Sequence, residues 1–563
     1  MNQLDETKGI GKVIAASSVG TLIEWYDFYI FGMLATIIAK HFFPEEAGAS
    51  ALLSTLAIFA AGFIVRPFGA LVFGRLGDIV GRKYTFLLTL VLMGGSTFAI
   101  GLVPGYKSIG WAAPLIVLAL RLIQGLALGG EYGGAATYVA EHSPAHKRGY
   151  YTSWIQTTAT LGLFLSLGII ILIRMNQGVD QFSAEWGGWR YPFWISIVLV
   201  GISIYIRMKM QESPLFASLK AEGKTSKNPL KESFTHRSNF KMVLMALFGA
   251  VMGQGVIWYT GQFYAQSFIE NVCKVNFIDS RNIVLFAIVF ATPFFVVFGS
   301  LSDRVGRKWI MLTGMLLGVL SYRPIYKSFL EMTAASSRSE KIELASCKSY
   351  DPVANPDSKD KKKIYLATKC DTVYNDGAVY TYTKTDTLYL SSEFVPGNIG
   401  NIAFAKMKAD STMDSMLVKL KVPYGKTAGT ETGMIAIDHI SAKPAVVVEK
   451  SVDSSTFWKM VLFVFLQILY VTMVYGPIAA FLVELFPTKI RYTSMSLPYH
   501  IGNGIFGGLV PFLATLIVEY TKTAEKPGGD PLAGLWYPIG VATVCFIIGA
   551  IYLSNKIDEN VMD

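Results

Sequence analysis

The ten-residue stretch GRLGDIVGRK at residues 74–83 occurs a second time as GSLSDRVGRK at residues 299–308. Each copy follows one long apolar run and precedes another. A second pattern, E-x-x-P-x-x-x-R, spans residues 141–148 and recurs at residues 484–491. Two motifs repeated in the same order predict two related membrane halves, which is the usual construction of a secondary transporter.

The spacing of the two repeats also locates an insertion. The first motif recurs after 225 residues and the second motif after 343 residues. The second half therefore carries about 118 additional residues between Lys308 and Glu484.

The composition is that of a membrane protein. Of the 563 residues, 52% are hydrophobic and 16% are charged, and the mean hydropathy is +0.42. Soluble proteins contain about 25% charged residues. The net charge of +10 lies largely in short loops between apolar runs, where basic residues orient membrane helices. We therefore expect a lipid bilayer around the chain and no nucleic-acid partner.

Apolar runs of about 20 residues, each long enough to cross a bilayer as a helix, recur along the chain. They predict an all-α membrane protein with twelve transmembrane helices in two six-helix, pseudo-symmetric bundles. We expect the spans at residues 13–38, 52–73, 84–104, 111–140, 151–174, 190–209, 242–268, 282–300, 309–327, 457–483, 493–518 and 533–553.

These spans divide the chain into five segments. Residues 1–216 would form the N-terminal bundle, and residues 217–241 a basic cytoplasmic linker. The C-terminal bundle would comprise residues 242–327 and 456–563, on either side of the insertion at residues 328–455.

The basic loops all fall on one side of the membrane if the spans alternate in direction. By the positive-inside rule this side is the cytoplasm. Both termini are then cytoplasmic, and residues 328–455 are extracytoplasmic. The first apolar run contains Glu24 and Asp27, which is unlike a cleavable signal peptide. We expect a multi-pass protein of the plasma (inner) membrane.

The insertion has the pattern of β structure. The runs KIYLAT, from Lys363, and AVYTYT, from Ala378, alternate as strands do, and NDG at residues 375–377 is a hairpin signal. We expect a small β-rich domain, and the alternative is a disordered loop. If the surrounding compartment is oxidising, Cys347 and Cys370 could form a disulfide.

The repeated loops have the composition of a gate between helices. Glycine lets two helix ends approach closely, and an Asp carboxylate can bind an Arg or a helix N-terminus. A plain basic turn is the alternative, but two matching copies argue against it. The candidate gate residues are Gly74, Asp78, Gly81, Arg82, Lys83, Gly299, Asp303, Gly306, Arg307, Lys308, Glu141, Arg148, Glu484 and Arg491.

Charged side chains inside the apolar runs point to a functional cavity. A charge in hydrocarbon is costly unless it meets water or a partner. Burial favours the neutral form of a carboxyl group, so Asp27, Glu24 and Glu131 are our candidates for proton coupling. A guanidinium stays charged and binds a carboxylate with two hydrogen bonds. The candidate substrate-binding residues are Arg121, Arg66, Gln124, Trp258, Tyr259, Tyr264, Tyr499 and Asn503.

Each of these side chains has a structural alternative. Asp27 could form a salt bridge with an arginine, and Glu131 could belong to a gate. Arg66 could anchor the cluster around Asp78. The aromatic candidates of the second half could pack as core, and His500 could be a packed polar residue.

Several further motifs give the chain a family resemblance. With these motifs and the repeated loop, the chain resembles members of the major facilitator superfamily, and in particular its metabolite:proton symporter branch. The resemblance covers nearly everything except residues 328–455, which are not a usual feature of that family. It implies proton-coupled import of an organic acid, an amino acid or a betaine. The motifs are EWYDF (24–28), RPFG (66–69), RLIQG (121–125), GGEYGG (129–134), WRYPF (189–193), ESP (212–214), WYTGQFY (258–264) and ELFP (484–487).

The sequence contains no motif that is typical of another class of function. There is no phosphate-binding loop for ATP, no nucleophile–base constellation and no cysteine–histidine spacing for a metal. We expect a transporter rather than an enzyme, with a small-molecule substrate and protons as its partners and without a cofactor. The alternative is a membrane receptor or assembly component, in which residues 328–455 bind a ligand or an extracytoplasmic protein partner.

Overall fold

The computed structural model divides into two compact units. The first contains residues 1–272, 280–329 and 458–563, and the second contains residues 273–279 and 330–457. The structure describes residues 10–44, 47, 49–79, 82–130, 132–208, 229–339, 346–349, 353–354, 363–390, 417–424, 429–440, 445–487 and 490–554.

The helices of the first half follow the apolar runs of the sequence. They are α1 (Ile10–Met33), α2 (Ala35–Phe42), α3 (Ala49–Ile64), α4 (Arg66–Ile79), α5 (Arg82–Ile100), α6 (Tyr106–Ile109), α7 (Ala112–Gly129), α8 (Tyr132–Glu141), η2 (Ala145–Lys147), α9 (Arg148–Phe182), η3 (Gly188–Arg190) and α10 (Tyr191–Met208).

The helices that follow the linker region repeat this arrangement. They are α12 (Pro229–Thr235), α13 (Arg237–Ala246), η4 (Leu247–Val251), α14 (Met252–Tyr259), η5 (Thr260–Tyr264), α15 (Ala265–Asn271), α16 (Phe277–Ala291), α17 (Pro293–Val305), α18 (Arg307–Met332), η6 (Ala335–Ser337), α19 (Ser454–Tyr475), α20 (Ile478–Leu485), α21 (Arg491–His500), η10 (Ile501–Gly507), α22 (Val510–Tyr520), η11 (Ala533–Leu535) and α23 (Trp536–Tyr552).

Within the described residues, nine helices are long and apolar enough to cross a membrane. The number is ten if α1 and α2, which meet at a 59° bend, form one span. The sequence predicts twelve, and the difference lies in α5 and α18. In α5 the fully described apolar stretch is Leu87–Ile100, which is shorter than a span, and α18 carries Arg323 and Lys327.

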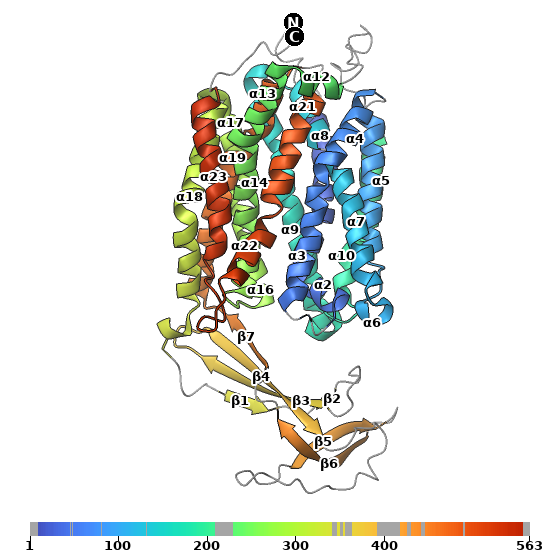
Figure 1. Ribbon diagram of the computed structural model, residues 1–563, viewed down its shortest axis with the longest axis vertical. Helices are drawn as coiled ribbons and strands as arrows, with labels where there is room; N and C mark the ends of the chain where they lie inside the picture. The colour runs from blue at the N-terminus through green and yellow to red at the C-terminus, as the bar shows by residue number, and fades with distance from the viewer. Residues whose placement is uncertain are drawn as a thin grey trace. The chain divides into compact units, whose positions relative to one another are not determined.

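The helices of the two halves lie side by side in the first unit, blue to cyan and green to red in Figure 1. Contacts join α9 with α17, α4 with α21, α3 with η10, and α8 with α20. The two halves therefore meet along two sets of helices, and polar side chains buried between them are positioned by both.

Glycines bring α7 against α3 and α4. A Cβ atom added at Gly125 would lie 1.9 Å from the carbonyl oxygen of Gly62, and one at Gly129 would lie 2.1 Å from that of Arg66. Any larger residue would push the helix backbones apart. This contact fixes where Arg121 on α7 lies relative to Arg66 at the start of α4.

Two helices of the second half contain π-helical turns. Leu247–Val251 and Thr260–Tyr264 interrupt the helix that runs from Arg237 to Asn271, and Ile501–Gly507 interrupts α21 and α22. Such turns shift the side chains that follow them and occur frequently at functional sites.

The second unit contains a sheet of seven strands, all paired antiparallel, in the order β1-β3-β4-β6-β5, with β2 pairing with β3 and β7 with β4. The turn between β3 and β4 lies at residues 375–377, with Gly377 at a φ of 91°. The strands are β1 (Ser346–Ser349), β2 (Val353–Ala354), β3 (Lys363–Val373), β4 (Val379–Leu390), β5 (Leu417–Tyr424), β6 (Gly429–Ile440) and β7 (Ala445–Ser451).

Covalent and ionic contacts hold this unit together. Cys347 on β1 and Cys370 on β3 face each other in register and form a disulfide. Arg338 forms ion pairs with Asp376, in the β3–β4 turn, and with Asp453, at 3.0 Å. Burial alone would raise the pKa of Asp453, but its bonds to Thr456 and Arg338 lower that pKa below its ordinary value.

We predict that Gly125→Ala destabilises the protein because its Cβ atom would meet the backbone of α3. The free energy of unfolding should fall by about 3 kcal/mol, at the upper end for inserting atoms into a packed core. Thermal unfolding in detergent measures the effect. Gly95→Ala is the matched control, because open space surrounds Gly95 and the midpoint should not fall. Equal midpoints for the two variants would contradict this account of the α3–α7 contact.

We also predict that Cys347 and Cys370 react with a maleimide only after reduction. The purified protein should gain two labels when a reductant is added, because Cys273 and Cys545 are buried. Mass spectrometry of the intact protein counts the labels. In Cys347→Ser, the partner cysteine should react without reductant. Labelling of the unreduced wild-type protein at Cys370 would show that the disulfide is not formed.

Candidate functional site

Arg121 lies at the centre of the first half with no exposed surface. Its Nη1 donates to Gln124 Oε1, and its Nη2 lies 3.5 Å from the carbonyl oxygen of Phe59. The guanidinium carbon is 4.7 Å from the ring centroid of Phe28 and 4.6 Å from that of Phe31. The Nε atom has no hydrogen-bond partner. Arg121 is therefore held by aromatic faces and one amide, and part of its binding capacity is unused.

Gln124 holds Arg121 in position. Its side-chain oxygen accepts from Arg121, and its Nε2 donates to the carbonyl oxygen of Asp27 at 3.2 Å and to Thr97 Oγ1 at 2.8 Å. These bonds tie α7 to α1 and α5. The structure thus brings Gln124 together with Arg121, in a positioning arrangement that already uses its amide.

Arg66 lies next to the same aromatic residues. Its guanidinium carbon is 4.5 Å from the ring centroid of Phe28 and 4.1 Å from that of Phe63, and 2% of the residue is exposed. Its Nε and Nη2 have no hydrogen-bond partner. No described acidic residue forms an ion pair with Arg66 or Arg121. The side chain of Asp78, the alternative anchor for Arg66, lies outside the described residues.

Asp27 is fully buried on α1. Among the described residues, neither carboxylate oxygen has a hydrogen-bond partner. No described arginine or lysine forms a salt bridge with it. Glu24, one turn earlier, is 3% exposed, and Glu131 lies outside the described residues.

The second half supplies an aromatic wall. Trp258 and Tyr259 on α14 are each 1% exposed, and Trp258 Nε1 and Tyr259 Oη have no hydrogen-bond partner. Tyr259 packs against Phe63 at 5.0 Å between centroids, and the same Phe63 ring centroid lies 4.1 Å from the guanidinium carbon of Arg66. Phe63 therefore connects Tyr259 with Arg66.

The other second-half candidates lie in different surroundings. Tyr499 Oη is 2.6 Å from Tyr475 Oη, and its ring stacks on Tyr132 of the first half with centroids 3.5 Å apart. Asn503 Nδ2 donates to Gln254 Oε1 at 2.7 Å. Tyr264 packs instead against Tyr326 and Phe268 within the second half.

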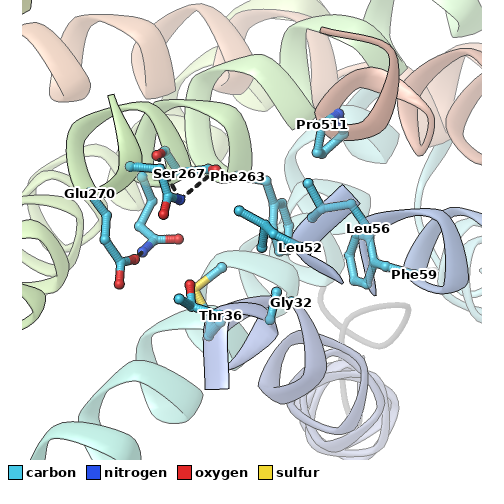
Figure 2. A pocket seen from close by; sticks show the side chains of 13 residues that line it. Gly32, Thr36, Leu52, Leu56, Phe59, Phe263, Ser267, Glu270 and Pro511 are labelled. Atoms are coloured by element: carbon cyan, nitrogen blue, oxygen red, sulfur yellow. Dashed lines mark hydrogen bonds between the residues drawn. The ribbon is translucent and has the colours of Figure 1, made fainter. Parts of the chain in front are cut away.

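A pocket lies between the two halves on the other side of Phe59. Gly32, Thr36, Leu52 and Leu56 line it from the first half, and Figure 2 shows Phe263, Ser267, Glu270 and Pro511 facing them from the second half. Phe59 lines the pocket, and its ring is 5.0 Å from the guanidinium carbon of Arg121 and 5.6 Å from the ring of Phe263. Phe59 and Phe263 thus stand between the pocket and Arg121.

An arginine beside this pocket joins the halves through its bond to Met33, while its ion-pair partner Glu270 lies in the same half as the arginine. Arg281 Nη1 is 3.1 Å from Glu270 Oε2, and its Nη2 donates to the carbonyl oxygen of Met33, at the bend between α1 and α2, at 2.7 Å. Neither charge is predicted from the sequence as part of a site, because both fall between the expected spans 242–268 and 282–300. A charge at the edge of each apolar run was the available signal.

The repeated motif joins the halves at the opposite ends of these helices. Asp303 accepts hydrogen bonds from the backbone N–H groups of Gly149 and Tyr150, both at 2.8 Å. It therefore caps the N-terminus of α9 across the interface. Arg307 pairs with Asp303 at 2.7 Å and with Glu484 at 2.9 Å.

The E-x-x-P-x-x-x-R motifs add two contacts to this closure. Arg148 lies 3.5 Å from Glu484, and Arg491 lies 3.8 Å from Glu141, so each pair crosses between the halves. Lys308 instead donates to the carbonyl oxygen of Ala550 on α23.

The glycines of the motif have separate roles. Gly299 packs against Ser153 and Gly149, Gly306 adopts a φ of 92°, and Gly74 lies beside Tyr492. Gly81 and the side chains of Arg82 and Lys83 lie outside the described residues. In the second copy, the glycines therefore permit the close approach and the turn that the ion pairs need.

The aromatic residues around the arginines are not predicted from the sequence as part of the site. Phe28, Phe59 and Phe63 lie inside apolar runs, where a phenylalanine facing lipid looks the same. Phe28 belongs to the EWYDF stretch that contains Asp27, and this proximity was the available signal.

Comparisons with known proteins agree with this construction. Residues 12–234 match the family described as "Sugar (and other) transporter". The chain is 37% identical over 326 residues to the inner membrane metabolite transport protein YhjE of Escherichia coli, covering 56% of this chain and 73% of that one. It is 34% identical to the proline/betaine transporter of Salmonella typhimurium, covering 56% of this chain and 63% of that transporter.

The fold is also that of a solved transporter. The xylose transporter XylE of E. coli, in a partially occluded inward open conformation, superposes with a TM-score of 0.58 at 14% identity and covers 98% of this chain and 99% of XylE. The comparisons give no support to a protein partner for residues 328–455. By the extent of its match to metabolite transport proteins, the chain belongs to the major facilitator superfamily of multi-pass membrane transporters.

Proposed function

We propose that the protein is a proton-coupled symporter that carries a small carboxylated metabolite into the cytoplasm by alternating access. One observation carries this proposal. Among the described residues, two buried guanidinium groups have no acidic partner and a buried carboxylate nearby has no basic partner, and contacts between the halves enclose them at both ends.

The arginines suit an anionic substrate. An uncompensated buried charge is strongly unfavourable. A carboxylate that enters the site would neutralise it and accept hydrogen bonds from the N–H groups of Arg121 and Arg66 that have no described partner. Trp258, Tyr259, Tyr499 and Asn503 would complete the site from the second half, with Gln124 as the residue that positions Arg121. The match to metabolite and proline/betaine transporters supports a carboxylated substrate class.

Asp27 suits a proton carrier. Its carboxyl group lies in apolar surroundings, so protonation removes an unfavourable buried charge. Gln124 donates to the backbone oxygen of Asp27 and accepts from the side chain of Arg121. A movement of α1 at Asp27 would therefore be transmitted to Arg121. Glu24 and Glu131 are further candidates for the same role.

Two closures would alternate during transport. The pairs around Glu484 and Asp303 would form the cytoplasmic gate, and Phe59, Phe263 and the Arg281–Glu270 pair the outer one. In this proposal the helical part has twelve spans, with bundles at residues 1–216 and at residues 242–327 with 456–563. The halves would rock about the buried arginines.

The orientation follows from the basic loops and the disulfide. We propose that both termini and the linker at residues 217–241 are cytoplasmic in a plasma (inner) membrane, and that residues 328–455 form an extracytoplasmic β-rich domain. A disulfide such as that between Cys347 and Cys370 is typical of an oxidising compartment, which supports this side for the domain.

Asp27→Asn should separate transport from the proton gradient. In proteoliposomes with an imposed pH gradient, uptake from a panel of labelled organic acids, amino acids and betaines should fall to background, because an amide cannot release a proton. Exchange of the same substrate without a gradient should remain. Asp180→Asn, at an exposed position, is the control. Gradient-driven uptake at the wild-type rate in Asp27→Asn would exclude this residue as the carrier.

Glu484→Gln should open the cytoplasmic gate by removing the partner of both Arg307 and Arg148. A cysteine at Ser496, which lies beside Gly133 of the first half and is 1% exposed, reports this opening in a background without Cys273 and Cys545. Its rate of reaction with a maleimide should rise severalfold.

Glu519→Gln is the matched control for this measurement, because it breaks only an exposed ion pair with Lys522. An unchanged labelling rate in Glu484→Gln would show that these pairs do not hold the gate closed.

A further inference from the structure

The two unpaired arginines share one aromatic ring. The guanidinium carbon of Arg66 is 4.5 Å from the centroid of Phe28, and that of Arg121 is 4.7 Å from the same centroid. The two carbons are therefore separated by no more than the sum of these distances, about 9 Å. Each group also contacts one further ring or more, so both are held rigidly.

The positive charges are not balanced from within the described protein. The guanidinium groups of Arg66 and Arg121 both lie against the Phe28 ring. No described carboxylate forms an ion pair with either, and the Asp27 carboxylate has no described hydrogen-bond partner. Two like charges in a low-dielectric interior repel each other strongly, so the site has capacity for two negative charges.

Unused donors surround the pair. Arg66 Nε and Nη2, Arg121 Nε, Trp258 Nε1 and Tyr259 Oη are all buried without a hydrogen-bond partner. His500 also has two unpartnered ring nitrogens and lies near Arg66. Buried donors are normally satisfied, and here the cluster extends from Arg121 to the second half. One carboxylate carries a single negative charge and would neutralise only one of the two guanidinium groups.

We propose that the substrate is a small dicarboxylate, with one carboxylate bound by Arg121 and the other by Arg66 and Tyr259. This inference rests on the proposed function and names its substrate class. A zwitterion such as a betaine would bring a positive charge next to two others, and a monocarboxylate would leave one guanidinium unneutralised. The aromatic faces of Phe28 and Phe63 would cover the apolar carbons between the carboxylates.

The test measures ligand affinity of the purified full chain by calorimetry. Succinate is compared with propionate, glycine betaine and inorganic phosphate. Succinate should bind at least about tenfold more tightly than propionate, because the second charge-assisted contact adds the corresponding free energy. Glycine betaine and phosphate should bind no better than propionate.

Two variants assign the contacts. Arg66→Gln should weaken succinate binding by about tenfold or more and reduce it to the level of propionate, while propionate binding changes little. Arg121→Gln should weaken both ligands. Arg237→Gln, at an exposed position, should change neither. Size-exclusion profiles identify any variant that fails to fold, and the comparison of ligands on the wild-type protein stands without the variants.

The outcomes separate the two proposals. Equal affinities for succinate and propionate, or tighter binding of glycine betaine, would overturn the dicarboxylate inference and leave the carboxylate symporter standing. Tight binding of phosphate without succinate binding would overturn the inference and the carboxylated substrate class together. Binding of none of the carboxylates would overturn both as well.

Discussion

The unbalanced charge of Arg66 and Arg121 is the constraint on which the rest of the site depends. Both side chains are almost completely buried, and aromatic faces supply most of their contacts. Cation–π contacts stabilise a guanidinium only partly when it is removed from water. Among the described residues, no carboxylate offsets these two charges, which is electrostatically unfavourable. In the proposed mechanism, anion entry relieves this repulsion and so links substrate binding to the closure of the helices.

The two ends of the helical unit are closed by different chemistry. At the motif end, carboxylates of the second half bind guanidinium groups and the exposed N–H groups at the start of α9. Near the pocket, closure is mainly aromatic, through Phe59 and Phe263, with Arg281 as the polar contact. Charge pairs respond to water and ions, whereas aromatic contacts respond to the shape of an entering molecule. In the proposed mechanism, the gate of charge pairs would thus respond to water and ions, and the aromatic gate to the shape of the substrate.

The duplicated plan and one side-chain contact could be predicted from the sequence. Repeated motifs predicted two halves, and Arg121 and Gln124, three residues apart on one helix face, were singled out together and are hydrogen-bonded. The aromatic surroundings were not predictable, because a phenylalanine in an apolar run carries no signal of the direction it faces. The partner of Asp303 was also not predictable, since the start of α9 is distant in sequence and is identified only by packing. Composition alone does not identify α18 as a membrane span, because the helix contains Arg323. The guanidinium carbon of Arg323 lies 4.6 Å from the ring centroid of Trp536, which stacks against the charge.

The bend between α1 and α2 has a consequence for how the outer closure is released. At the bend, the amide of Ile37 donates to the carbonyl oxygen of Leu34 rather than to that of Met33, which is the regular α-helical acceptor four residues earlier. The Met33 oxygen is thereby left for Arg281. Straightening of α1 into α2 would return this oxygen to Ile37 as Arg281 departs. The hydrogen bond from Ile37 would replace the one from Arg281, so the number of hydrogen bonds to the Met33 oxygen would not change when Arg281 departs.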